Sequence, residues 1–127
     1  MRLCVDFAND LDARRYEQVL ALFTEDAVLD RMGTVASGRE EIARFLASRP
    51  TDLATRHICS NIRVSFDAQH EAGGTCYVLF FQGTGDVGSG AAQLSGPPAV
   101  VEYHDRFLRT AGGWKILSRR IRMAMRP

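Results

Sequence analysis

The sequence predicts an α+β domain in which helices come first and an antiparallel sheet follows. Two observations support this prediction. In the first part of the chain, apolar residues recur every three or four positions, as they do along one face of a helix. From about residue 54 onward the apolar period changes to two, which is typical of strands. Helices that precede strands in this way are expected to pack on one face of the sheet.

Two helices are expected before residue 25. The first has apolar residues at four-residue spacing, namely Leu3, Phe7 and Leu11. The second carries a longer apolar stripe, namely Tyr16, Val19, Leu20, Leu22 and Phe23. We expect this second helix to be capped by Asp10 or Asp12 and to end near Thr24.

A short strand and a third helix follow. Residues 27–29 are expected to form the strand, and residues 32–34 the turn after it. The third helix covers 39–46, begins after Gly38 and is stopped by Pro50. Three apolar residues of this helix are expected to face inward: Ile42, Phe45 and Leu46.

The second half of the chain predicts a long strand from about residue 54. Its apolar residues roughly alternate with polar ones: Ile58, Ile62, Val64 and Phe66. A turn is expected over 67–74, and the dense apolar run over 75–82 predicts a strand buried on both faces. Residues 83–96 contain five glycines and predict either a long hairpin tip or a lid.

The last hairpin is expected to pair 100–109 with 114–123 through a turn at 110–113. Alternation along the first of these strands places Tyr103, Asp105 and Phe107 on one face. The opposite face holds Glu102, His104 and Arg106. The sequence alone leaves open which of the two faces lines the interior.

Length and charge exclude several classes of protein. The chain has 127 residues, 46% of them hydrophobic, so one domain over 1–127 is expected. Its net charge is only +1, which gives no field to attract nucleic acid or an acidic membrane. No apolar run reaches the roughly 20 residues of a membrane span, and the N-terminus does not resemble a signal peptide. We expect a cytoplasmic protein without nucleic-acid or membrane partners.

No metal or cofactor is expected. The three histidines are scattered, and no phosphate-binding glycine motif occurs. The cysteines, Cys4, Cys59 and Cys76, are odd in number and form no CxxC pair. We expect them to be buried, inert thiols.

Four stretches, in this order and spacing, resemble the SnoaL-like branch of the nuclear transport factor 2-like superfamily. They lie at residues 12–28, 38–42, 55–61 and 103–119. The resemblance implies a cone-shaped, cystatin-like fold, with three N-terminal helices packed on a strongly curved, mixed, largely antiparallel sheet. It also implies a homodimer through the outer face of the sheet. The superfamily includes dehydratases, isomerases, polyketide cyclases and non-catalytic modules, so the site must decide the function.

The same resemblance identifies a candidate catalytic pair. His57 matches the histidine of the Asp-His pair in scytalone dehydratase and hexachlorocyclohexane dehydrochlorinase, and Asp12 matches the aspartate. A histidine whose other nitrogen is held by a carboxylate can take a proton from carbon. This predicts a cofactor-independent lyase or isomerase acting on a small apolar substrate. The alternative is a non-catalytic module for ligand binding or dimerisation, in which Asp12 caps a helix and His57 bonds within the sheet.

Five further residues are candidates for binding the substrate: Tyr16, Asp30, Asn61, Tyr103 and Asp105. Tyr16 follows Asp12 by about one helical turn, so both project from one face. Asp30 lies close to where ketosteroid isomerases of the superfamily carry their base. The position that matches their tyrosine donor is Phe7, which cannot donate, so steroid isomerisation is not expected. Asn61 either bonds within the sheet or lines the pocket, and His104 is a weaker candidate for a second histidine.

Overall fold

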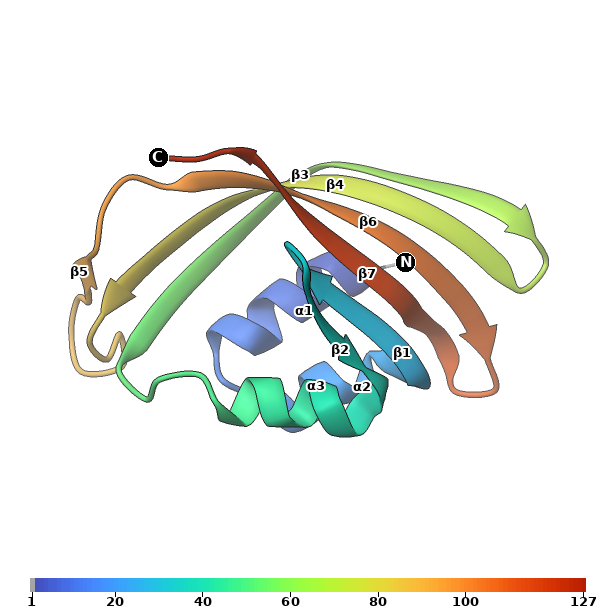
Figure 1. The fold of residues 1–127 in the computed structure, drawn as a ribbon, viewed down its shortest axis with the longest axis horizontal. Coiled ribbons are helices and arrows are strands. Elements are labelled where there is room, and N and C mark those ends of the chain that lie inside the picture. Colours follow the sequence, from blue (N-terminus) through green and yellow to red (C-terminus); the bar gives the residue numbers. More distant parts are fainter. Residues whose placement is uncertain (1) are drawn as a thin grey trace.

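The computed structural model describes residues 2–127 and contains helices followed by long strands (Figure 1). Helices α1 (Leu3–Asp12) and α2 (Tyr16–Ala21) precede a hairpin of β1 (Phe23–Arg31) and β2 (Thr34–Ser37). Helix α3 (Gly38–Ala47) comes next. The remaining strands are β3 (Leu53–Ala68), β4 (Glu71–Thr84), β5 (Gln93–Leu94), β6 (Ala99–Thr110) and β7 (Gly113–Met125). None of the helices in the described part of the chain has the length and hydropathy needed to cross a membrane.

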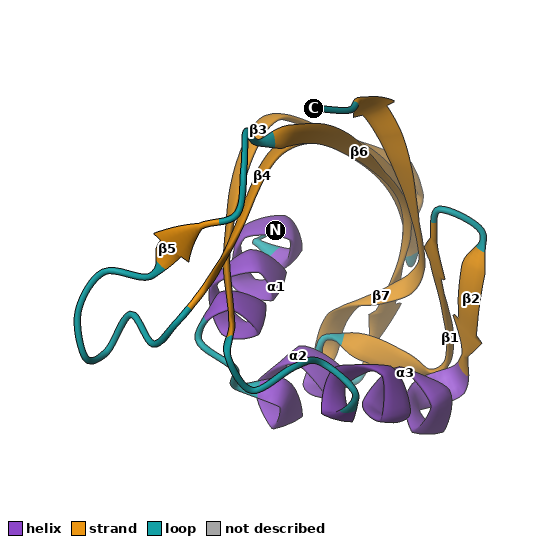
Figure 2. Ribbon diagram, turned by 60° about the vertical axis from the view of Figure 1, so that its left-hand side comes forward, coloured by secondary structure: helices purple, strands orange, loops and turns teal. Residues whose placement is uncertain are grey.

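The strands form one sheet in the order β2-β1-β7-β6-β4-β3, with β5 paired to β4. Strands β1 and β7 run parallel, and the other pairs are antiparallel. The predicted α+β class with a mixed, largely antiparallel sheet is therefore confirmed. Figure 2 shows β3, β4, β6 and β7 arching over the helices. Helix α1 packs against β3 and α3 packs against β1, so the helices occupy the inner side of the arch.

The core lies between α1 and the inner face of the sheet. Phe7 of α1 makes edge-to-face contacts with Phe23 and Tyr103, each with ring centroids 6.0 Å apart. On β6, Tyr103, Asp105 and Phe107 are buried. This settles the alternative that the sequence left open, because the opposite set faces outward.

The second helix is shorter than expected. It ends at Ala21, and Phe23 and Thr24 already belong to β1, because Phe23 pairs with Ile116 of β7 and is fully buried there. The predicted cap is also wrong. The residue before α2 is Arg15, which makes no side-chain cap and instead donates its Nε–H to Asp10 Oδ1 at 3.0 Å.

The turn predicted over 67–74 is much shorter, because β4 already begins at Glu71. A Cβ on Gly74 would lie 2.8 Å from Phe107 Cε2, and one on Gly73 would lie 2.8 Å from Arg106 Nη1. Gly74 therefore permits close packing across the sheet, whereas the atom near Gly73 is the tip of a half-exposed side chain that can move. Both glycines lie within β4 and neither marks a turn. Strand β4 is also not buried on both faces, since Tyr77 is 50% exposed while its neighbours Cys76 and Val78 are buried.

The apolar residues of β3 do not share one buried face. His57 and Cys59 point toward the helices, which leaves Ile58 on the outer face with 52% of its surface exposed. A bulge then shifts the register between Ser60 and Arg63, and Asn61 adopts a left-handed φ of 52° there. A bulge inserts one extra residue and reverses the faces that follow it, which the alternation alone did not reveal.

Candidate active site

A cavity of about 350 Å³ lies between the helices and the inner face of the sheet. Its walls are mainly apolar: Phe7, Leu11, Leu29, Phe45, Phe80, Val101, Tyr103 and Ile121. Its basic groups come from Arg31, Arg49 and His57. Residues 83–96, which the sequence left open as a hairpin tip or a lid, do not line this cavity. A mainly apolar cavity with a few convergent polar groups is the usual form of a small-molecule site.

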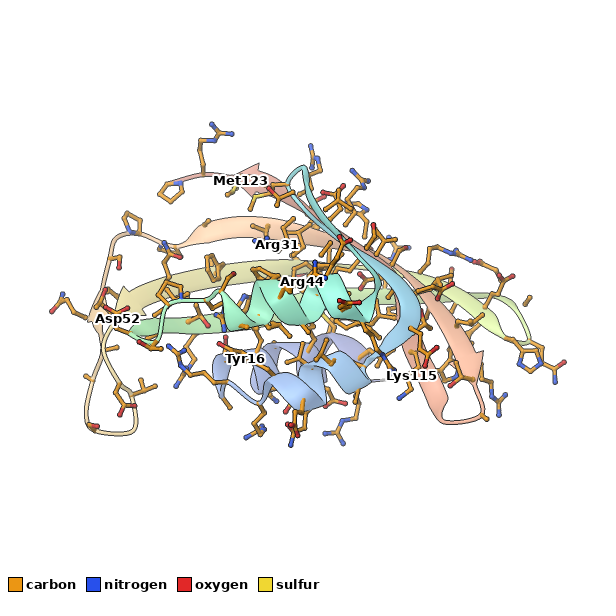
Figure 3. All side chains as sticks on the ribbon, turned by 60° about the horizontal axis from the view of Figure 1, so that its bottom comes forward. Tyr16, Arg31, Arg44, Asp52, Lys115 and Met123 are labelled. Atoms are coloured by element: carbon orange, nitrogen blue, oxygen red, sulfur yellow. The ribbon has the colours of Figure 1, made fainter. Side chains whose placement is uncertain are left out.

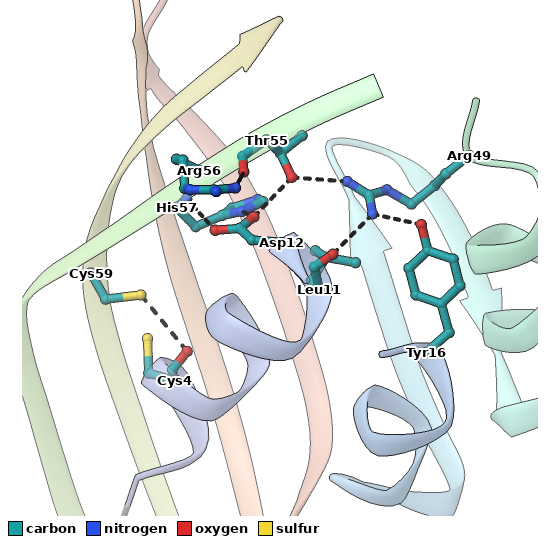
Figure 4. A network of polar contacts seen from close by, with 9 residues as sticks. All are labelled: Cys4, Leu11, Asp12, Tyr16, Arg49, Thr55, Arg56, His57 and Cys59. Carbon is teal, nitrogen blue, oxygen red and sulfur yellow. Dashed lines mark hydrogen bonds and ion pairs between the residues drawn. The ribbon is translucent and has the colours of Figure 1, made fainter. Parts of the chain in front are cut away.

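The structure brings Asp12 into contact with His57, as Figure 4 shows, and the His57 side chain lines this cavity. Asp12 is the last residue of α1, and its Oδ1 lies 2.6 Å from Nδ1 of His57 on β3. Its Oδ2 accepts the backbone N–H of His57 at 2.9 Å. The two side chains are only 10% and 9% exposed. A carboxylate on Nδ1 holds the proton on that nitrogen, so the lone pair of Nε2 is left for a ligand.

Thr55 bonds the Asp12 carboxylate, and Arg49 in turn bonds Thr55 (Figure 4). The Thr55 hydroxyl donates to Asp12 Oδ1 at 2.8 Å and accepts from Arg49 Nη2 at 3.1 Å. Arg49 also donates to the Leu11 carbonyl at 3.2 Å and to the Tyr16 hydroxyl at 2.9 Å. This chain of bonds ties α1, α2 and β3 into one unit around Asp12. Such supporting bonds keep a reacting group in position.

The His57 ring is also held by Phe80, which lies across from it on β4 with ring centroids 4.8 Å apart. The apolar ring covers one side of the imidazole. Packing on one side and a carboxylate on the other together fix the direction in which Nε2 points.

Two of the other predicted site residues, Tyr103 and Asp105, lie in the interior. Tyr103 faces the cavity, whereas the carboxylate of Asp105 is paired with Arg119. Tyr103 lines the cavity and is 1% exposed, and burial raises the pKa of its phenol well above the ordinary value. Asp105 forms two hydrogen bonds of 2.8 Å with the Nε and Nη2 of Arg119, whose side chain is fully buried. Burial alone would lower the pKa of Arg119, but Asp105 more than offsets this and raises it.

The remaining candidates lie outside the cavity. The Tyr16 hydroxyl is occupied by Arg49. The Asp30 carboxylate accepts the backbone N–H of Gly33 at 2.8 Å and closes the β1–β2 turn. Asn61 is exposed at the bulge of β3. His104 also lies on the outer face, where its Nε2 is 3.0 Å from Glu102 Oε1.

Sequence reasoning missed three polar residues at this site, namely Arg31, Arg49 and Thr55. Thr55 could have been found, because it lies two residues before His57 on the same strand and so on the same face. Nothing local in the sequence marks Arg31 or Arg49, which reach the cavity from a strand end and from the segment after α3.

The three cysteines also converge, which their wide spacing did not suggest. The Sγ atoms of Cys4, Cys59 and Cys76 all lie within 4.8 Å of one another, and those of Cys4 and Cys76 are 2.8 Å apart. Hydrogen bonds with the other two thiols, together with burial, raise the pKa of Cys76. Among residues 2–127, this cluster is the group of side chains that could hold a soft metal ion, for which thiolates are the preferred ligands.

The comparisons with known proteins agree on the fold. The chain is similar to the crystal structure of a candidate scytalone dehydratase from Novosphingobium aromaticivorans, with 25% identity, 98% of this chain and 80% of that chain covered, and a TM-score of 0.82. It is also similar to ActVI-ORFA from Streptomyces coelicolor, with 22% identity, 96% and 92% covered, and a TM-score of 0.77. An NTF2-like protein with a cystatin-like fold from Novosphingobium aromaticivorans has 21% identity, 97% and 78% covered, and a TM-score of 0.77.

No curated protein matches the chain significantly. The family comparison is more direct, because residues 1–120 match the SnoaL-like domain. The resemblance stated from the sequence is thereby confirmed, and so is the NTF2-like, cystatin-like fold. The chain belongs to the SnoaL-like domain family.

Proposed function

We propose that the protein is a proton-transfer enzyme that acts without a cofactor on a small, largely apolar substrate. The observation that carries this proposal is the 2.6 Å contact between Asp12 Oδ1 and His57 Nδ1 at the wall of the apolar cavity. A dehydratase, an isomerase and a cyclase of this kind all begin with removal of a proton from carbon. The name of the Novosphingobium relative points to the dehydratase type.

In this mechanism His57 is the base and Asp12 its positioning residue. The Nε2 lone pair takes a proton from a carbon next to a carbonyl or another activating group, and the electron pair of the C–H bond moves into the substrate. The imidazolium that forms is stabilised by the Asp12 carboxylate, which keeps its own charge. His57 then returns the proton to a leaving hydroxyl or to another carbon. Elimination and double-bond shift differ only in this second step.

The neighbouring bonds of Asp12 fit this role. Thr55 and the backbone N–H of His57 both donate to the carboxylate. These bonds hold the carboxylate in position against His57 Nδ1, where it can stabilise the imidazolium that forms. Apolar walls exclude water from the imidazolium and strengthen its attraction to Asp12.

The test is deuterium uptake by carbon acids that fit the cavity, such as aryl ketones and cyclic ketones. Each is incubated with the protein in D₂O, and the exchange at carbon is followed by NMR. We expect the wild-type protein to speed the exchange of one class of these compounds, and His57→Gln to lower that rate on the order of 10²- to 10⁴-fold. His104→Gln, the same substitution on the outer face of the sheet, is the matched control and should retain the wild-type rate. Exchange that His57→Gln leaves unchanged would contradict the proposal.

A second proposal concerns assembly, as in the non-catalytic alternative. We propose that the outer face of β3 and β4 pairs with a second copy of the chain. Ile58 is 52% exposed and Tyr77 is 50% exposed on adjacent strands of this face, and large apolar side chains in such a position favour an interface. Sedimentation equilibrium should give a dimer for the wild type and a monomer for Ile58→Asp. A wild-type monomer at high concentration would contradict this proposal.

A further inference from the structure

Arg31 lines the cavity, and no ion pair within residues 2–127 balances its charge. It is the last residue of β1, and Figure 3 shows it close to α3. Its guanidinium lies over the ring of Phe45 on that helix, 3.5 Å from the ring centroid. The Nε atom is buried and has no hydrogen-bond partner among residues 2–127. Nor does any carboxylate of the described residues pair with Arg31.

Two other arginines, the buried Arg119 and the half-buried Arg49, show how this fold treats a guanidinium without a ligand role. Arg119 is matched by the carboxylate of Asp105, although its Nη1 has no partner among residues 2–127, and Arg49 is matched by the hydroxyls of two neighbours and a backbone carbonyl. Arg31 has neither. Burial lowers its pKa, which means that the charge has lost water without gaining an acid. A partner from outside the chain would remove this cost.

The stacking on Phe45 determines which edge of Arg31 is available. An aromatic ring against the flat face of a guanidinium leaves the N–H groups in the plane free to donate. The Nε atom is closed off from solvent, so the fork that a ligand can reach is the one formed by the two terminal nitrogens, which make no hydrogen bond within residues 2–127. This fork has the spacing of the two oxygens of a carboxylate, and such paired bonds are both strong and specific. A neutral carbonyl could use only one of the two donors.

Arg31 and His57 stand on opposite sides of the cavity. Arg31 ends β1 and His57 lies on β3, and three strands separate them in the sheet, namely β7, β6 and β4. The sheet arches between them (Figure 2), and both residues line the same cavity. A ligand with its reacting carbon at His57 can therefore place a second group at Arg31, with an apolar body between them.

We infer that the cavity binds an organic carboxylate, whose two oxygens pair with the terminal N–H groups of Arg31 while its apolar body contacts the aromatic walls. This names the substrate class of the site proposed above, and its assignment as a substrate rests on that proposal. The binding itself does not depend on catalysis. Arg31 would fix the orientation of the acid and so determine which of its carbons meets His57.

The test compares an acid with its neutral isostere. The affinities of 2-naphthoate and 2-naphthamide are measured by calorimetry at pH 8, where an ordinary imidazole is neutral, together with benzoate and decanoate as acids of other shapes. We expect at least one acid to bind saturably and the naphthoate to bind on the order of 10- to 100-fold more tightly than its amide. Arg31→Gln should abolish this preference, and Arg31→Lys should retain part of it.

Two variants make the comparison specific. Arg120→Gln removes the same charge from an exposed position and should retain the wild-type preference. His57→Gln should also retain it, although it slows deuterium exchange strongly, so failure of the proposed function and failure of this inference give different results. Should Arg31→Gln not fold, the Nε–H resonance of Arg31 in the wild type serves instead. It should shift saturably with naphthoate and not with the amide.

Three results would overturn the inference. They are the absence of saturable binding by all the acids, equal affinity for naphthoate and its amide, and a preference that survives in Arg31→Gln. A preference lost in His57→Gln and kept in Arg31→Gln would also overturn it, because the histidine would then hold the anion.

Discussion

The carboxylate of Asp12 holds His57 at two points, at ring Nδ1 with Oδ1 and at the backbone N–H with Oδ2. One carboxylate thereby fixes both the strand and the side chain that it supports. The imidazole cannot rotate without losing the 2.6 Å contact. Its tautomer and its direction are set by the end of α1, which is distant in the sequence.

This arrangement predicts the tautomer of His57. With Asp12 ionised, the proton is on Nδ1, and Nε2 is unprotonated when the ring is neutral. Asp12→Asn can present an amide N–H to the same nitrogen, which moves the proton to Nε2. In the wild type we expect the ¹⁵N shift of a protonated nitrogen at Nδ1 and that of an unprotonated nitrogen at Nε2. In Asp12→Asn we expect the reverse. Unchanged shifts would mean that Asp12 does not control the ring.

Thr55 predicts a graded loss of rate. Thr55→Val removes the hydroxyl that donates to Asp12 at 2.8 Å but retains the shape of the side chain. Because one bond to a charged group is lost, we expect kcat for the exchange to fall on the order of 10-fold, with KM unchanged. Thr55→Ser retains the hydroxyl and should restore most of the rate. A fall in Thr55→Ser equal to that in Thr55→Val would show that only packing matters.

Asp105 is predicted to stabilise the fold. Asp105→Asn leaves the buried charge of Arg119 without its counter-ion, which costs about 3–5 kcal/mol in the free energy of unfolding. The matched control is Asp67→Asn, which breaks a half-exposed pair with Arg106 and should cost about 1 kcal/mol or less. Urea unfolding measures both. A small loss of stability in Asp105→Asn, accompanied by weaker ligand binding, would instead support the role in substrate binding that the sequence suggested.

Tyr103 predicts how stability depends on pH. Burial raises the pKa of its phenol above the ordinary value of 10.0, so the folded protein retains the proton after the unfolded chain has released it. The stability is therefore fully present below about pH 10 and is lost as the pH rises above that value. In Tyr103→Phe the fall between about pH 9 and 11 should be shallower than in the wild type. Parallel curves for the two proteins would contradict this.

The sequence predicted local features best. The four-residue spacing of Leu3, Phe7 and Leu11 correctly identified α1, and alternation correctly identified β6 and β7. It failed where contacts distant in the sequence decide the structure. Phe23 extends β1 because Ile116 pairs with it, and Gly74 lies within β4 because Phe107 packs above it. Neither contact leaves a local signal.

The same distinction holds at the site. Resemblance to known family members identified Asp12 and His57, which the structure then brings into contact. Arg31 was not identified, because a single arginine at a strand end looks like a solvated side chain until the arch of the sheet places it in the cavity. The cysteine cluster was missed for the same reason, since its members come from α1, β3 and β4.

The central claim is that Asp12 and His57 act as one unit in proton transfer. It is tested most directly by a double-mutant cycle on the deuterium exchange rate of a carbon acid that the wild-type protein processes. Groups that act as a unit show strongly non-additive losses. We predict that Asp12→Asn with His57→Gln loses no more rate than His57→Gln alone. Losses that multiply, or a wild-type rate in His57→Gln, would contradict the account.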